Sequence, residues 1–138
     1  MPGTIYDYFI RACQRRVPPE AERGLPGGIM TGRGGNRARF WLDVCDGRIR
    51  AVYYAATSCT TLLAACQHVS ELAAGQDLLS LSKLGAAEIA ALHPEVAPSK
   101  RDSIALAVEA FQAALAASVA AYSGVSDSRS FAAEEQLH

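Results

Sequence analysis

Hydrophobic residues recur along this chain with two different periods, one typical of strands in a single segment and one typical of helices before and after it. Between residues 37 and 44 apolar and polar side chains alternate, the period of two that predicts a strand with one buried face. Asp46-Gly47 predicts a tight hairpin turn, and residues 49–56 form the predicted returning strand. The glycine-rich stretch before this hairpin is either loop throughout or loop around a short edge strand at 29–31. The pattern therefore predicts an antiparallel β-meander of two or three strands.

Helical periodicity flanks this meander on both sides. Residues 4–16 carry an apolar stripe at helical spacing, which the two prolines that follow Val17 bring to an end. A second apolar stripe runs through residues 62–73 and ends at Gly75, and residues 77–92 fit a turn followed by a helix. The last predicted helix, through residues 104–122, has the most regular periodicity, and we expect Asp102 or Ser103 to cap it.

The order of these elements predicts an α+β fold. It consists of a small antiparallel β-meander with helices packed on one face, which leaves the other face to solvent or to a partner. Polar positions at Arg37, Arg39 and Asp43 suit that open face. We expect one domain over residues 1–123 and a flexible polar tail over residues 124–138.

Composition narrows the class of protein without identifying it. The chain has 138 residues, of which 50% are hydrophobic and 20% charged, with a net charge of −1. This near-neutral total gives no electrostatic reason to expect nucleic acid or membrane as a partner. No apolar run has the length and continuity of a membrane span, and no export signal is visible at the start, so we expect a cytoplasmic protein with four free thiols.

Several segments, taken in order, carry a resemblance to a known family. They are the helical start at residues 5–9, the loop Gly32-Arg33-Gly34-Gly35-Asn36 before the first long strand, the strand-to-helix junction at Cys59, the helix exit at residues 70–75, and Lys100-Arg101-Asp102-Ser103 before the final helix. Together they resemble the IscU/NifU N-terminal family of iron–sulfur cluster assembly scaffolds, from about residue 5 to residue 122. The resemblance implies the same α+β fold.

The resemblance also places a cluster site in which most ligands are replaced. Three cysteines and an aspartate surround the cluster in the family, and position by position the first cysteine becomes Gly34 and the aspartate Asn36. The last His-Cys pair becomes Asp102-Ser103, so only Cys59 keeps its thiol. The candidate metal or cluster ligands are therefore Cys59, Asp102, Asn36 and Ser103.

One thiolate among oxygen and amide groups is a poor match for an iron–sulfur cluster, which is normally held by several thiolates. The expected cofactor is iron, an iron–sulfur cluster, or none. A homodimer could share a cluster with one Cys59 from each copy, but that cluster would still need further ligands. The start of a helix favours the thiolate form of Cys59, whereas the alternative is a structural residue at the junction. Cys66 lies on a core stripe, and His68 is expected to be solvated or to cap a helix.

Candidate docking residues lie on two segments. Trp41 and Arg39 share the polar face of the predicted strand, and Pro98 and Lys100 stand where the family has its chaperone-recognition stretch. Two functions are kept. The first is a divergent scaffold-like protein in iron–sulfur assembly or iron and sulfur trafficking, whose partners are assembly proteins or a client metalloprotein. The second is a non-catalytic interaction or regulatory module that lost the cluster. The sequence shows no acid–base pair at a spacing that would predict an enzyme.

Overall fold

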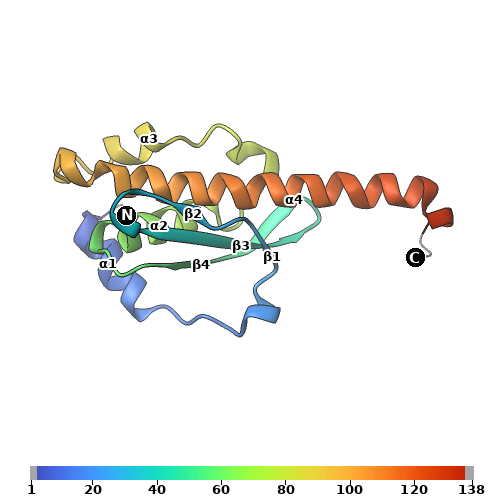
Figure 1. Cartoon of the computed structure of the whole chain (residues 1–138), viewed down its shortest axis with the longest axis horizontal. Helices are drawn as coiled ribbons and strands as arrows, with labels where there is room; N and C mark the ends of the chain where they lie inside the picture. Colours follow the sequence, from blue (N-terminus) through green and yellow to red (C-terminus); the bar gives the residue numbers. More distant parts are fainter. Residues whose placement is uncertain (1–2, 136–138) are drawn as a thin grey trace.

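The computed structural model describes residues 3–135 of the chain, with side chains described through residue 122. A small antiparallel sheet is covered by helices, and one long helix runs along it (Figure 1). The α+β class predicted from the sequence is confirmed.

The sheet is organised around β3 (Arg37–Cys45), which pairs with all three other strands. On one edge lies β4 (Arg48–Ala56), joined to β3 by Asp46 and Gly47, whose positive φ values of 53° and 77° suit a two-residue hairpin turn. On the other edge β1 (Leu25–Pro26) and β2 (Met30–Thr31) follow one another along β3. The sheet therefore has four strands, one more than the largest number we predicted.

The described residues form four α-helices, α1 (Ile5–Gln14), α2 (Thr60–Ala73), α3 (Ala86–Ala91) and α4 (Arg101–Glu135), of which α2 and α4 pack on the sheet while α1 packs on α2 and α3 on α4. Thr4 caps α1 in a capping box with Asp7, and Gly75, with a φ of +84°, follows the end of α2 as predicted. Because the 3₁₀ turn Pro98–Lys100 leads directly into α4, Asp102 and Ser103 lie in its first turn rather than at its cap. Shorter 3₁₀ turns occupy Glu20–Glu22, Arg33–Gly35 and Leu78–Leu81.

The core lies between the sheet and the pair α2 and α4. The residues of β3 that face it are Phe40 and its strand neighbours of the same parity, and Phe40 meets Phe111 of α4 edge to face with ring centroids 5.6 Å apart. Leu62 of α2 and Ile104 of α4 are equally buried. The alternation seen in the sequence thus separates a core face of β3 from an open face that carries Arg37, Arg39 and Trp41.

Helix α4 supplies much of this core. The stretch Pro98–Tyr122, which starts in the 3₁₀ turn before α4, is long and apolar enough to cross a membrane by length and composition, but half of that window is buried inside the protein, and core helices pass the same test. The backbone of α4 continues through residue 124 to Glu135 and extends past the sheet (Figure 1). Flexibility of the tail 124–138 stays a prediction, and residues 136–138 lie outside the described part.

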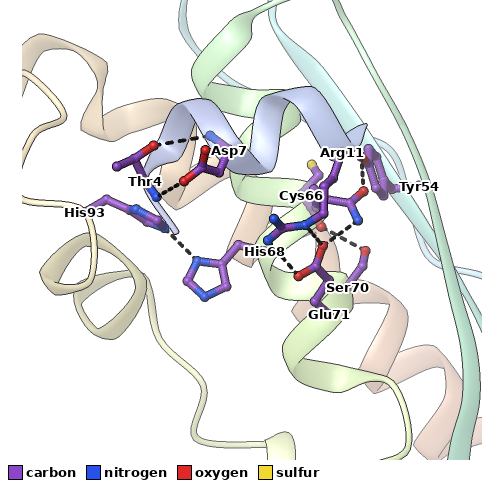
Figure 2. A network of polar contacts seen from close by, with 10 residues as sticks. Thr4, Asp7, Arg11, Tyr54, Cys66, His68, Ser70, Glu71 and His93 are labelled. Carbon is purple, nitrogen blue, oxygen red and sulfur yellow. Dashed lines mark hydrogen bonds and ion pairs between the residues drawn. The ribbon is translucent and has the colours of Figure 1, made fainter. Parts of the chain in front are cut away.

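The surroundings of His68 contradict our expectation for this residue. His68 of α2 and His93, after α3, are only 2% and 1% exposed, and their Nδ1 and Nε2 atoms lie 2.7 Å apart (Figure 2). The Tyr8 ring of α1 stacks on His68 at 4.1 Å. The prediction that His68 is solvated or capping is wrong, because α1 packs over α2 and encloses a residue whose local sequence gives no sign of that contact.

Candidate functional site

Three segments far apart in sequence meet at one pocket of about 190 Å³. They are the glycine loop before β3, the start of α2 and the start of α4. All four candidate ligands and Gly34 line this pocket. The full lining is Arg33, Gly34, Asn36, Cys59, Ser99, Lys100, Asp102, Ser103 and Leu106. We call it the Cys59 pocket.

Cys59 occupies the N-cap position of α2. Its backbone is extended, with a φ of −139°, and its carbonyl accepts the first helical hydrogen bond from the Leu63 N–H at 2.9 Å. The thiol makes no capping bond to the described helix, so it is not tied to the backbone of α2. Instead Sγ lies 3.6 Å from the Ser103 hydroxyl of α4, and the side chain is half-buried. The thiol is therefore held at the pocket wall by a contact between the two helix starts.

Asn36 is engaged on the other side of the pocket. Its Oδ1 accepts a hydrogen bond from the Thr57 hydroxyl at 3.0 Å, and that hydroxyl also accepts from the Arg37 backbone N–H at 3.1 Å. These bonds tie the glycine loop to the end of β4. The amide oxygen that would be offered to a metal is thus already used to hold the loop.

The carboxylate of the pocket has a cationic neighbour. Arg33 Nε lies 3.2 Å from Asp102 Oδ2, and both side chains are largely exposed. Lys100 lines the same pocket, so its two cations outnumber its one carboxylate. An exposed pair of this kind contributes little to stability, but it competes with a metal ion for the carboxylate.

The donor set does not fit a cluster held by this chain alone. Within the described part of the chain, no three His, Cys, Asp or Glu side chains are grouped so that they could hold a metal ion. The other thiols lie outside the lining of the pocket: Cys13 and Cys45 are exposed, and Cys66 is buried in the core, where burial raises the pKa of its thiol. The pocket therefore offers one thiol and one carboxylate.

The docking candidates lie in different settings. Lys100 reaches the Cys59 pocket, and Pro98 begins the turn before it. Trp41 is only 4% exposed, because the guanidinium groups of Arg23 and Arg39 lie over its ring at 4.5 and 5.2 Å from the centroid. The surface presented there consists of arginine side chains rather than of the indole.

Sequence reasoning missed several lining residues. Arg33 lies inside the glycine loop that the resemblance had already marked, so its position at the pocket could have been predicted from the sequence. Leu106 follows Asp102 and Ser103 by one helical turn, which puts it on the same side of α4. Ser99 lies between Pro98 and Lys100, in the stretch that the resemblance had marked for docking rather than for the pocket.

The chain was compared with protein families, with curated proteins and with solved structures. A family model described as the NifU-like N terminal domain matches residues 22–124. No curated protein matches the chain. Among solved structures, the crystal structure of a hypothetical protein at 2.3 Å resolution aligns with a TM-score of 0.49 and 15% identity, covering 64% of this chain and 81% of that one.

Proposed function

This chain belongs to the NifU-like N-terminal domain family of iron–sulfur cluster assembly scaffolds, and from that membership we propose that it acts in cluster assembly, or in iron and sulfur trafficking, through the single thiol of Cys59. One observation supports this proposal above the others. The same pocket gathers Gly34, Asn36, Asp102 and Ser103 around Cys59, so the thiol is surrounded by the residues that the resemblance aligns with the rest of the family's cluster site.

A lone accessible thiol can contribute to this work in two ways. It can supply one ligand to iron while a second protein supplies the rest, since a cluster normally needs several thiolates or histidines. It can also accept sulfur. In that step the Cys59 thiolate attacks the outer sulfur of a persulfide on a partner's cysteine, a new S–S bond forms on Cys59, the partner's S–S bond breaks, and the partner leaves as a thiolate. No external oxidant or reductant is needed.

The remaining ligands of any cluster handled here would come from outside the chain, from a second copy or from a client metalloprotein. Iron and the cluster are then cargo. The role we propose is non-enzymatic and cytoplasmic.

Anaerobic reconstitution with ferrous iron and sulfide tests the proposal. We expect wild-type protein to gain visible absorbance, or to carry a persulfide on Cys59 by mass spectrometry after incubation with a persulfide donor. Cys59→Ser should abolish both signals. Cys45→Ser is the matched control, since Cys45 is an exposed thiol outside the pocket, and it should behave as wild type. A wild type with neither iron nor persulfide would contradict the proposal.

The second function, a non-catalytic interaction or regulatory module, is favoured by a different observation. The oxygen donors of Asn36 and Asp102 are both engaged by protein groups, from Thr57 and Arg33. If the protein is such a module, the Cys59→Ser variant should bind the partner as tightly as the wild type does, whereas the Arg39→Ala variant should bind it more weakly. The reverse result, loss of binding in Cys59→Ser alone, would argue against it.

A further inference from the structure

The net charge of −1 hides a strongly uneven distribution along the chain. Residues 11–50 contain nine arginines and no lysine, against four acidic side chains, a local net charge of +5. Residues 51–138 contain four basic and nine acidic side chains, a local net charge of −5. The positive half includes the end of α1, the loops that follow it and most of the sheet, whereas the negative half is largely helical.

Part of this positive charge lies on the open face of the sheet. Arg37 and Arg39 alternate with the buried residues of β3, so their side chains leave the strand on the side opposite the core. Beside them lies a pocket of about 250 Å³, which we call the guanidinium pocket. Its lining consists of Ile29, Arg37, Ala38, Arg39, Ala55, Ala56 and Thr57. Two arginine side chains and several aliphatic residues thus line the pocket, and this lining contains no carboxylate.

The two arginines differ in how firmly they are held. Arg39 donates from Nε to the Gly27 carbonyl at 2.8 Å and lies over the Trp41 ring, which fixes the direction of its guanidinium. Its Nη1 is 3.9 Å from the exposed carboxylate of Glu20, a distance that leaves the terminal nitrogens available. The Arg37 side chain makes no hydrogen bond or ion pair with any residue that the structure describes.

Arginine is suited to recognise carboxylates, because its planar guanidinium donates two parallel hydrogen bonds and carries little hydration. Ile29 is 57% exposed at the rim of the pocket and offers apolar surface for an aliphatic neighbour. We propose that the guanidinium pocket docks an acidic segment of a partner protein. A glutamate or aspartate side chain of that segment bonds to Arg37 and Arg39, and an adjacent aliphatic side chain rests on Ile29 and Ala55.

The same surface is poorly suited to nucleic acid. Trp41, the chain's single tryptophan, is covered by arginine side chains and presents no free ring face on which a base would stack. Arg50, the nearby arginine that could extend a basic stripe, is already bound by both carboxylate oxygens of Asp43 at 3.0 and 3.1 Å, so it is not free to bind a continuous phosphate backbone. Two arginines at one small pocket match one or two carboxylates more closely than a polyanion.

Docking at this position would bring a partner close to the Cys59 pocket. Thr57 lines the guanidinium pocket, and its hydroxyl donates to Asn36, which lines the Cys59 pocket. The two pockets therefore share a wall built from the Thr57–Asn36 hydrogen bond. The acidic-segment binding itself does not depend on the thiol, so it holds whether or not the function proposed for Cys59 is correct.

Trp41 provides a built-in probe for the test. The purified full chain is titrated, at low and high salt, with a synthetic peptide of glutamates and leucines, and with the same peptide in which every glutamate is glutamine. We expect a saturable change in Trp41 emission with the glutamate peptide only, weakening as salt is added. Arg37→Glu should weaken binding at least roughly tenfold, since one charge-assisted contact is lost and replaced by repulsion. Arg39→Gln provides a second, independent variant.

Controls separate this inference from its alternatives. Lys83→Glu, a matched charge reversal at an exposed site outside the pocket, should leave the affinity unchanged, as should Cys59→Ser. The inference is overturned if the glutamate and glutamine peptides bind equally, if no saturable change occurs at low salt, or if Arg37→Glu binds as wild type. It is also overturned if oligothymidylate binds more tightly than the peptide with the same dependence on Arg37.

Discussion

Acidification from about pH 7.5 to about pH 5 should destabilise this protein through His68. The imidazole is 2% exposed and hydrogen-bonded to His93 at 2.7 Å (Figure 2). The Tyr8 ring stacks on it with ring centroids 4.1 Å apart. Burial is the main cause that lowers the pKa of His68 from 6.5 to about 4; the neighbouring charges of His93 and Arg11 act in the same direction, and that of Glu71 opposes them. Protonation of His68 is therefore less favourable in the folded state than in the unfolded chain.

The size of the effect follows from the two pKa values. Above the unfolded value of 6.5 neither state holds the proton, so the contribution of the neutral imidazole is fully present. As the pH falls from there toward about 4, the unfolded chain holds more protons and the free energy of unfolding decreases by up to about 1.4 kcal/mol per pH unit. The accumulated loss is about 2 kcal/mol at about pH 5 and tends to about 3 kcal/mol below the folded pKa.

Urea denaturation followed by circular dichroism measures this loss directly. The relevant window is about pH 7.5 to about pH 5, because most carboxylates remain ionised there in both states. His68→Gln is the matched variant, since it keeps a polar side chain without a titrating proton. Its baseline stability should be lower than that of the wild type, but its pH dependence in this window should be nearly flat.

Two results would refute the reasoning. One is a wild-type free energy of unfolding that does not change across the window. The other is a slope in His68→Gln as steep as in the wild type, which would assign the proton to a different group. Proton NMR of the imidazole gives a separate check, because a midpoint near 6.5 in the folded protein would remove the basis of the prediction.

Three further predictions rest on packing. Gly27→Ala should lower the urea midpoint by an amount equivalent to about 2 kcal/mol or more, because its Cβ would lie 2.5 Å from the Ala114 backbone, whereas Gly28→Ala, with nothing within 4 Å, should change it little. Phe111→Ala removes a fully buried ring and should cost about 3–5 kcal/mol in the same measurement. Under native conditions a thiol reagent should leave the buried thiol of Cys66 unmodified and should reach it only on unfolding, as detected by peptide mass mapping.

The long strands were predictable because their information is local. Alternation around Phe40 and the Asp46-Gly47 turn are sufficient to define β3, β4 and their connection. Strand β1 was not predictable, since it is two residues long and contains Pro26, and only its pairing with Leu42 and Trp41 makes it a strand. The fourth strand is thus a product of tertiary structure.

The candidate site, like the fold, was predictable from the sequence only in part. Spacing against the family pattern marked Cys59, Asn36 and the start of α4, and those segments do meet at one pocket. The interactions that decide its chemistry were not visible, because the Thr57–Asn36 bond joins residues 21 positions apart and the Arg33–Asp102 pair joins two distant segments. His68 and His93, 25 positions apart, were likewise brought together only by the packing of α1.

The tandem placement of β1 and β2 along β3 has a consequence for the behaviour of this protein at high concentration. An open strand edge is a template for intermolecular pairing, and aggregation begins most easily at long, flat edges. Two short segments separated by a glycine bend occupy one side of β3, so that side presents no uninterrupted ladder. At the opposite edge the backbone of Ile49 bonds to Gly75 and Gln76, and Arg15 reaches the Tyr54 carbonyl. Both edges of the sheet are therefore covered. The sheet can expose one face to solvent without promoting edge-to-edge association between molecules.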